Sequence, residues 1–274
     1  MRISVRGFTL DVQVAGPSDG EPVLLLHGFP QHAGEWEQVA ALLHAHGYRT
    51  VAPNQRGYSP EARPTEVSEY RIGELVADAL ALLDERGMDS AHVVGHDWGA
   101  VVGWHLAGRY PDRVRTLTAV SVPHPHALAA AALEDEDQRE RSSYIALFRQ
   151  PGKAEEVLLH DDAIRLRRML AGCPPERIAE YVTPMLEPGA LTAALNWYRA
   201  MGPDEAGPLG RVTVPTTFLW SDRDTAVGAV AAQRCAAYVT GPYRFIPLPG
   251  ASHWIPDELP GEVAEAVMAG ATVK

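Results

Sequence analysis

The chain of 274 residues is 46% hydrophobic, so it can bury a sizeable core in one large domain or two small ones. Its 35 acidic residues outnumber the 24 basic ones and give a formal net charge of −11, which argues against a nucleic-acid partner. No basic cluster or basic amphipathic helix suggests binding to a membrane surface.

The N-terminus and the cysteines indicate where the protein functions. Residues 1–5 lack the hydrophobic stretch and cleavage site of a signal peptide, and no apolar run approaches the length of a membrane span. Cys173 and Cys235 are isolated, form no metal-binding motif, and are not expected to form a disulfide. A reducing, cytoplasmic setting is therefore the simplest expectation.

Strand and helix patterns alternate through the first 122 residues. Residues 2–14 alternate in polarity as a β-hairpin does, with Gly7 at the turn. Short apolar runs predict further strands at 22–26, 48–52, 91–94 and 114–122. Amphipathic spacing predicts helices at 36–46, 70–86 and 99–110, and residues 59–68 read as a polar loop.

The pattern changes at about residue 126. Strand signals disappear, and the chain becomes helical and more charged, which predicts an inserted helical cap over residues 126–210. Strands return at 214–220 and 243–247, and helices are predicted at 227–239 and 258–269.

The alternation of strands and helices predicts an α/β fold. We expect a mostly parallel sheet with helices on both faces, formed by residues 1–125 and 211–274. In such sheets the chemistry lies at the carboxyl ends of the strands.

The stretch Gly95-His-Asp97-Trp-Gly99 joins a predicted strand to a predicted helix. It has the form of the nucleophile elbow Gly-x-Ser-x-Gly, with Asp97 in place of the serine. The sharp turn leaves no room for side chains two residues to either side, which explains the glycines. An aspartate at a helix N-terminus stays ionised and can attack carbon, although a Gly-Asp turn that merely caps the helix is the simpler alternative.

Two further predicted strands end in candidate catalytic residues. Asp97, an acid at Asp222 or Asp224, and His253 follow one another in the order of the α/β-hydrolase triad, nucleophile, acid and histidine. A carboxylate that attacks an sp³ carbon forms an ester with the substrate. A histidine oriented by a second carboxylate can then activate water to hydrolyse that ester.

Hydrolysis of such an ester passes through an oxyanion, which needs hydrogen-bond donors. The expected donors are the backbone N–H groups of Trp98, which follows Asp97, and of Phe29, in the loop after His27-Gly28. His27 is expected to shape this loop, and the role of His96 is left open.

The sequence resembles the soluble epoxide hydrolases of the α/β-hydrolase fold over nearly its whole length. The most specific matching motifs are His27-Gly28-Phe29-Pro30, Arg56-Gly57-Tyr58, Gly95-His96-Asp97-Trp98-Gly99 and Gly250-x-x-His253-Trp254. Two positions depart from the family pattern: Asn54, where an acid often precedes Arg56-Gly57, and Ser221, where a glycine usually follows the tryptophan.

Two segments of the predicted cap add to the resemblance, one from Ser143 to Glu155 and one from Asn196 to Arg199. The resemblance implies that the hydroxyls of Tyr144 and Tyr198 bind the epoxide oxygen and protonate the leaving alkoxide, as general-acid catalysis requires. Without that context each tyrosine would be read as a packing residue.

The resemblance also favours Asp224 over Asp222 as the triad acid, because Asp224 fits the last position of the family's Trp-Gly-x-x-Asp pattern. Asp222 is then interpreted as a turn residue.

The resulting expectation is an epoxide hydrolase that converts a small apolar epoxide and water into a vicinal diol. An Asp97 alkyl-enzyme ester would be hydrolysed by water activated by the His253–Asp224 pair. No cofactor or metal is expected, because His124 and His126 lack nearby cysteine or carboxylate ligands and are interpreted as the start of the cap. A homodimer is left open.

Other functions are weighed against this one. A haloalkane dehalogenase also uses Asp followed by Trp, but its usual second halide donor, an asparagine after His-Gly, is Phe29 here. Trp98 in place of a basic residue argues against a haloacid dehalogenase, and Asp97 in place of serine argues against an esterase. A ligand receptor without turnover on the same scaffold is the alternative from another functional class.

Overall fold

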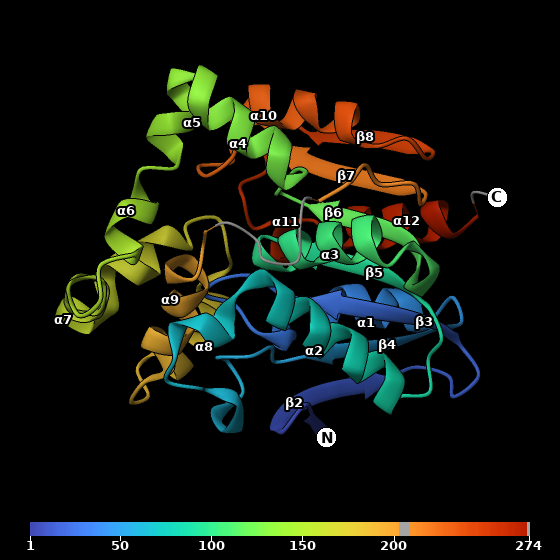
Figure 1. Cartoon of the computed structure of the whole chain (residues 1–274), viewed down its shortest axis with the longest axis horizontal. Helices are drawn as coiled ribbons and strands as arrows, with labels where there is room; N and C mark the ends of the chain where they lie inside the picture. The colour runs from blue at the N-terminus through green and yellow to red at the C-terminus, as the bar shows by residue number, and fades with distance from the viewer. Residues whose placement is uncertain (203–208, 273–274) are drawn as a thin grey trace.

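Eight strands form one sheet in the order β1-β2-β4-β3-β5-β6-β7-β8 (Figure 1). The computed structural model describes residues 1–202 and 209–272. β1 and β2 pair antiparallel, β2 pairs antiparallel with β4, and all other pairs are parallel. The strands are β1 (Arg2–Val5), β2 (Phe8–Ala15), β3 (Glu21–Leu26), β4 (Tyr48–Pro53), β5 (Ala91–His96), β6 (Val114–Val120), β7 (Thr216–Ser221) and β8 (Tyr243–Leu248).

Helices cover both faces of this sheet, because the apolar strand residues point alternately to either side. In β3, Leu24 and Leu26 join the larger core cluster with α2 and α3, whereas Val23 and Leu25 join a second cluster with α1 and α12. The helices that accompany the sheet are α1 (Glu37–His44), α2 (Ile72–Glu85), α3 (Trp98–Arg109), α10 (Ala229–Arg234), α11 (Ile255–Glu258) and α12 (Pro260–Ala271). The expected α/β class and the mostly parallel sheet are confirmed.

Several predicted boundaries were wrong. The helix predicted at 227–239 is only α10, followed by the 3-10 helix η5 (Cys235–Tyr238), whose Tyr238 ring stacks on His124 at 4.8 Å. The predicted loop at 59–68 contains η2 (Pro60–Ala62) and the start of η3 (Val67–Tyr70). Two more 3-10 turns, η1 (Ala33–Trp36) and η4 (Pro111–Arg113), precede α1 and β6. Such short turns lack the repeated apolar spacing that identifies a helix in a sequence.

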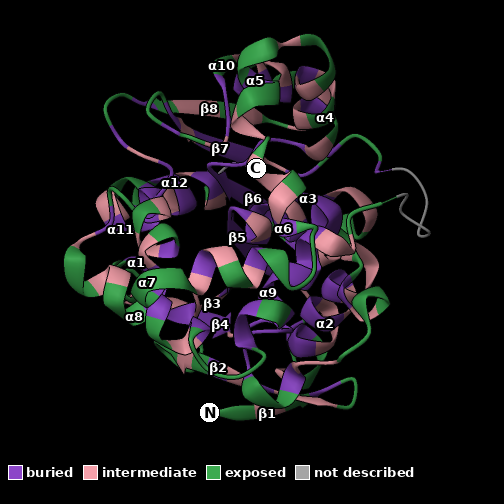
Figure 2. Ribbon diagram, turned by 90° about the vertical axis from the view of Figure 1, so that its left-hand side faces the viewer, coloured by how far each residue is buried: buried purple, intermediate pink, exposed green. Residues whose placement is uncertain are grey.

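Between β6 and β7 the described chain forms helices. They are α4 (Pro125–Glu134), α5 (Glu136–Arg141), α6 (Tyr144–Phe148), α7 (Lys153–Met169), α8 (Pro175–Met185) and α9 (Ala190–Arg199). α7 is interrupted at residues 160–163, which have non-helical backbone angles. Residues 203–208, the end of the predicted cap, lie outside the described residues. Figure 2 shows buried residues concentrated in the central strands, whereas α5 is mostly exposed.

The helical segment packs over the carboxyl ends of the strands. The Phe29 ring, three residues after β3, contacts Phe148 of α6 and Tyr198 of α9 with centroid distances of 5.4 and 5.5 Å. Trp98, at the start of α3, contacts Trp197 of α9 at 5.6 Å. Aromatic edge-to-face contacts therefore join the helical segment to the loops that follow β3 and β5.

Asp257 of α11 forms a second attachment between the helical segment and the core. Its buried carboxylate accepts hydrogen bonds from Tyr181 (2.7 Å) and Arg177 (3.0 Å), both on α8. The side-chain amide of Gln31, from the loop after β3, donates to the other carboxylate oxygen at 2.9 Å. One acid thus joins α8 to the core, four residues beyond His253.

Across the described residues, we find no helix with the length and apolar character needed to span a membrane.

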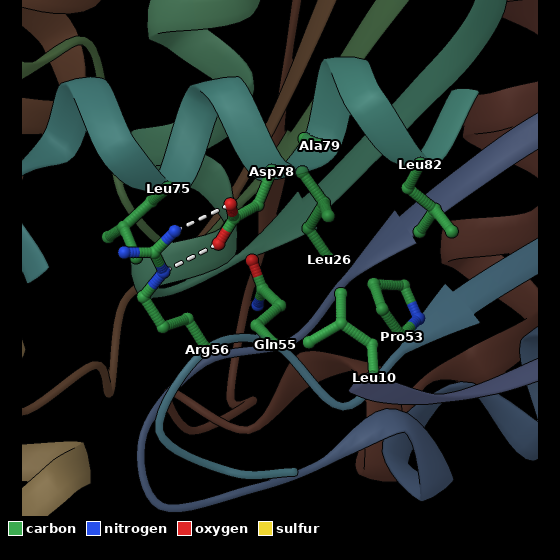
Figure 3. Close-up of a pocket in the computed structure, with 9 residues that line it drawn as sticks. All are labelled: Leu10, Leu26, Pro53, Gln55, Arg56, Leu75, Asp78, Ala79 and Leu82. Atoms are coloured by element: carbon green, nitrogen blue, oxygen red, sulfur yellow. Dashed lines mark hydrogen bonds and ion pairs between the residues drawn. The ribbon is translucent and has the colours of Figure 1, made fainter. Parts of the chain in front are cut away.

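The loop after β4 is held by a buried ion pair, shown in Figure 3. Arg56 is 1% exposed, and its Nε and Nη2 atoms donate to the two carboxylate oxygens of Asp78 on α2, each at 2.7 Å. The Arg56 carbonyl accepts a hydrogen bond from Trp197 Nε1 at 2.9 Å. The bidentate pair connects the loop to α2, and the Arg56 carbonyl connects the loop to α9.

Replacing Asp78 by alanine leaves the buried Arg56 guanidinium without its bidentate partner. We expect Asp78→Ala to lower the free energy of unfolding by about 3 kcal/mol, because the buried guanidinium then keeps ion pairs only with partly exposed carboxylates, such as Glu69 at 3.1 Å. Urea unfolding monitored by tryptophan fluorescence measures the loss.

The double variant Arg56→Met/Asp78→Leu removes both charges and serves as the matched control. It should lose less stability than Asp78→Ala. An equal or greater loss in the double variant would contradict the assignment of the effect to charge pairing.

Candidate active site

The elbow between β5 and α3 requires close approach of backbone segments. A Cβ on Gly95 would overlap the carbonyl of Gly99, and a Cβ on Gly99 would overlap the carbonyl of Leu26. Asp97 itself has φ of 50°, a conformation that costs energy for a residue with a side chain. The structure thus holds Asp97 in a strained position at the start of α3, as expected for an elbow.

The structure brings Asp97, Asp224 and His253 together from the ends of β5, β7 and β8. His253 Nδ1 lies 2.7 Å from Asp224 Oδ2, and His253 Nε2 lies 3.6 Å from Asp97 Oδ2. All three residues are buried. Asp224 Oδ1 also accepts hydrogen bonds from the backbone N–H groups of Ala226 and Val227, at 2.7 and 2.9 Å. Asp224 is thereby fixed to orient the imidazole.

Asp222 occupies a different position. Its Oδ1 accepts a hydrogen bond from the backbone N–H of Gly250 at 2.7 Å, in the turn after β8. Of the two candidate acids, the structure therefore places only Asp224 beside His253.

The opposite charges of His253 and of the two carboxylates, Asp97 and Asp224, stabilise one another. Burial lowers the pKa of His253, but the nearby Asp224 and Asp97 outweigh it and raise that pKa to about 10. Burial raises the pKa of Asp97, but the hydrogen bond and charge of His253 outweigh it, and the pKa falls below its ordinary value. Asp97 is therefore ionised at neutral pH while an imidazolium faces it.

The two oxygens of Asp97 have different surroundings. The backbone N–H of Phe29 donates to Oδ1 at 2.9 Å, whereas Oδ2 faces His253. The N–H of Trp98 is the first in α3, where no acceptor within the helix is available to it. The N–H groups of Phe29 and Trp98 are the two expected oxyanion donors, and the first of them already binds Oδ1.

His27 shapes the loop that carries Phe29. Its Nε2 accepts a hydrogen bond from the backbone N–H of Gln55 at 3.0 Å, so its Nδ1 carries the proton and donates to the Gly28 carbonyl at 2.9 Å. Burial lowers the pKa of His27 to about 3, so the ring is neutral. A Cβ on Gly28 would overlap the Asp97 side chain, which explains the glycine.

Tyr144 of α6 and Tyr198 of α9 lie close to each other, with ring centroids 6.2 Å apart. Burial, followed by the charge of Asp97, raises the pKa of Tyr144, and burial, followed by Tyr144 and Asp97, raises that of Tyr198. Both hydroxyls therefore keep their protons at neutral pH. An ion pair between Arg199 and Glu155, at 2.9 Å, ties the two cap segments to each other.

A cavity of about 960 Å³ contains the Asp97 side chain together with both tyrosines. This volume is at the upper end of the range for small-molecule sites. Most of its lining is apolar, and α2, α3 and α4 contribute residues to it. The site can accept an uncharged organic molecule and present a carboxylate and two hydroxyl donors to it.

Sequence reasoning missed Glu35 and left His96 unassigned. His96 Nε2 lies 2.9 Å from the His253 carbonyl oxygen, and its Nδ1 lies 3.1 Å from Glu35 Oε2. Burial raises the pKa of Glu35 to about 7, although His96 lowers it. The sole signal in the sequence is an acid shortly after the His27-Gly28 motif, next to Trp36.

The histidine pair at the start of α4 has packing partners. His124 stacks on Tyr238, and its Nδ1 accepts from the backbone N–H of His126 at 3.2 Å. Burial lowers the pKa of His124 to about 4. The described residues contain no group of three or more His, Cys, Asp or Glu side chains arranged to hold a metal ion.

An acid at a strand–helix elbow, followed by an acid and a histidine at later strand ends, is the arrangement of an α/β hydrolase. A sequence model of the alpha/beta hydrolase fold matches residues 21–260. Epoxide hydrolase A of Mycobacterium tuberculosis is 33% identical, over 97% of this chain and 95% of that protein. The chain belongs to the α/β-hydrolase fold family and, within it, to the epoxide hydrolases.

Solved structures agree with this assignment. The crystal structure of epoxide hydrolase A from Mycobacterium thermoresistibile is 32% identical and has a TM-score of 0.86, covering 98% of this chain and 97% of the other. An epoxide hydrolase from Bacillus megaterium, solved with an inhibitor, has a TM-score of 0.90 at 26% identity, and both chains are covered in full.

Because Asp224 raises the pKa of His253, Asp224→Asn should lower that pKa from about 10 toward the ordinary value of about 6.5. NMR titration of the histidine side chains measures the change. Asp222→Asn is the matched control and should leave the titration of His253 as it is in the unmodified protein. A lowered pKa in Asp222→Asn, with none in Asp224→Asn, would reverse the assignment of the two acids.

Proposed function

We propose that the protein hydrolyses an epoxide to a vicinal diol through a covalent ester on Asp97. The observation that carries this proposal is the placement of the Asp97 carboxylate: Phe29 N–H donates to Oδ1 at 2.9 Å, Oδ2 lies 3.6 Å from His253 Nε2, and the side chain lines a cavity shared with two tyrosines. A carboxylate held by these contacts at the wall of a cavity is prepared to act as a nucleophile. The names of the relatives, which are epoxide hydrolases, support the substrate class.

In the first step Oδ2 of Asp97 attacks a carbon of the epoxide. The C–O bond of the ring breaks, and its electron pair moves to the epoxide oxygen. Tyr144 or Tyr198 donates a proton to that oxygen, which makes the alkoxide a better leaving group. The products of this step are an Asp97 ester that carries a neighbouring hydroxyl, and a tyrosinate.

In the second step water cleaves the ester. Esterification removes the negative charge of Asp97, so His253 loses one of the two charges that raise its pKa. The proton of His253 passes to the tyrosinate, which restores the tyrosine and leaves His253 neutral. Neutral His253 then accepts a proton from water through Nε2, while the water oxygen attacks Cγ of Asp97. The charge that develops on Oδ1 is stabilised by the N–H groups of Phe29 and Trp98, and the ester C–O bond breaks. The leaving diol oxygen takes the remaining proton of the added water, so that Asp97 is again a carboxylate beside a protonated His253.

A halide leaving group fits this site less well. In a haloalkane dehalogenase the indole N–H of Trp98 would bind the halide, but here the Trp98 side chain is hydrogen-bonded to Tyr198. Position 29 supplies a phenylalanine ring, which has no polar donor. Tyrosine hydroxyls that keep their protons suit an oxygen leaving group, so the epoxide is the better substrate.

Trapping the ester tests the proposal directly. His253→Gln should keep the nucleophile and lose the base, so incubation with styrene oxide should add the mass of one epoxide to the intact protein. Asp97→Asn is the matched control and should gain no mass.

Three other results would contradict the proposal. An adduct on Asp97→Asn would show that another residue is modified. An adduct from an alkyl halide alone, with release of halide, would favour a dehalogenase. Correctly folded His253→Gln with no adduct from either reagent would favour a receptor without turnover.

The two tyrosines should act in the first step. In the His253→Gln background, Tyr144→Phe and Tyr198→Phe should each slow ester formation about tenfold or more, and the double variant should lose about 10²- to 10⁴-fold, the range of general-acid catalysis. The growth of adduct mass with time measures this rate. A double variant that forms ester at the unmodified rate would remove the tyrosines from the mechanism.

A further inference from the structure

The cavity extends along one face of α3. Trp98, Val101 and His105 all line it, and their spacing of three and four residues places them in one stripe on the helix surface. Because an α-helix rises about 1.5 Å per residue, this stripe leads roughly 12 Å from Asp97 to His105.

The cavity lies to one side of Asp97. Its described lining comes from η3 and the start of α2, from α3, α4 and α6, from the end of α9, and from residues 226–227. Residues of α8 and α11, which Asp257 joins through Tyr181 and Arg177, are absent from this described lining. A substrate whose reacting carbon lies at Asp97 therefore has room for a substituent in the direction of α3.

The walls of this part of the cavity are mainly apolar. Its apolar lining includes Ile72, Val101, Val122, Leu128, Ile145 and Met201. Two carboxylates also contribute to the lining, but Glu69 is paired with Arg56 at 3.1 Å and Glu74 with Arg6 at 2.7 Å. The surface beside the α3 stripe therefore favours hydrocarbon over a charged group.

We propose that this stripe is the binding site for one extended apolar substituent, so that the preferred substrate is a terminal epoxide with a chain of about eight carbons, comparable to the length of the stripe. The inference rests on the proposed epoxide hydrolysis and specifies its substrate class. The epoxide ring lies between Asp97 and the two tyrosines, and the chain lies over Trp98 and Val101 and ends near His105. Val101 is then a specificity-determining residue.

The chain-length dependence of kcat/KM tests this proposal. Across terminal alkyl epoxides from propylene oxide to tetradecene oxide, each methylene added to the shorter chains should raise kcat/KM by up to about fourfold, the value for full burial of one methylene. The increase should stop when the chain reaches His105. Epoxides with a long chain on both carbons should be poorer substrates than the matching terminal epoxide.

Val101→Phe narrows the stripe one turn beyond Asp97. We expect the increase in kcat/KM to stop at a shorter chain in Val101→Phe, and the milder Val101→Leu keeps the test available if the larger side chain prevents folding. Leu133→Phe is the matched control, because Leu133 is 80% exposed on α4 and is absent from the lining of the cavity. Its chain-length profile should equal that of the unmodified protein.

The outcomes separate this inference from the proposed function. Turnover of terminal epoxides with no dependence on chain length would overturn the inference and leave epoxide hydrolysis standing. A folded Val101 variant whose profile equals that of Leu133→Phe would also overturn it. Failure of the unmodified protein to turn over any epoxide would overturn the proposed function, and this inference with it.

Discussion

The close approach of three backbone segments at the elbow is the constraint on which the rest of the site depends. Gly99 lies against the carbonyl of Leu26, Gly95 lies against Gly99, and Gly28 lies against the Asp97 side chain. Any side chain at these positions would push β3 and α3 apart. Because the segments do meet, the N–H of Phe29 reaches Asp97 Oδ1, and the strained Asp97 backbone directs Oδ2 toward His253.

In the proposed mechanism the same carboxylate couples the two chemical steps through its charge. An ionised Asp97 raises the pKa of His253, so the histidine holds a proton before substrate binds. Formation of the proposed ester would remove that charge and lower the pKa of His253 in the step that needs a base. Asp224 remains beside the ring throughout, held by two backbone N–H groups, so the imidazole keeps its orientation when its charge changes.

A feature of this structure can be predicted from the sequence when residues close to it along the chain determine it. The elbow, the strands and their buried faces follow from local patterns, and the mostly parallel sheet agrees with them. The contact of Glu35 with His96 does not, because it joins residues 61 positions apart that no motif relates. The end of the predicted helix at 227–239 was likewise misplaced, since Tyr238 turns to stack on His124 across the fold.

The direction of the cavity likewise depends on contacts between residues far apart in the sequence, so the sequence did not predict it. The sequence places Val101 and His105 on one stripe of α3, but an apolar stripe on a helix usually faces the core. What makes this stripe line a cavity is the position of α4, α6 and α9 around it, and that position depends on contacts such as Trp98 with Trp197 and Asp257 with Tyr181. The positions of the candidate catalytic residues are thus determined mainly by the core strands, whereas the shape of the cavity is determined by how the helical segment is attached to those strands.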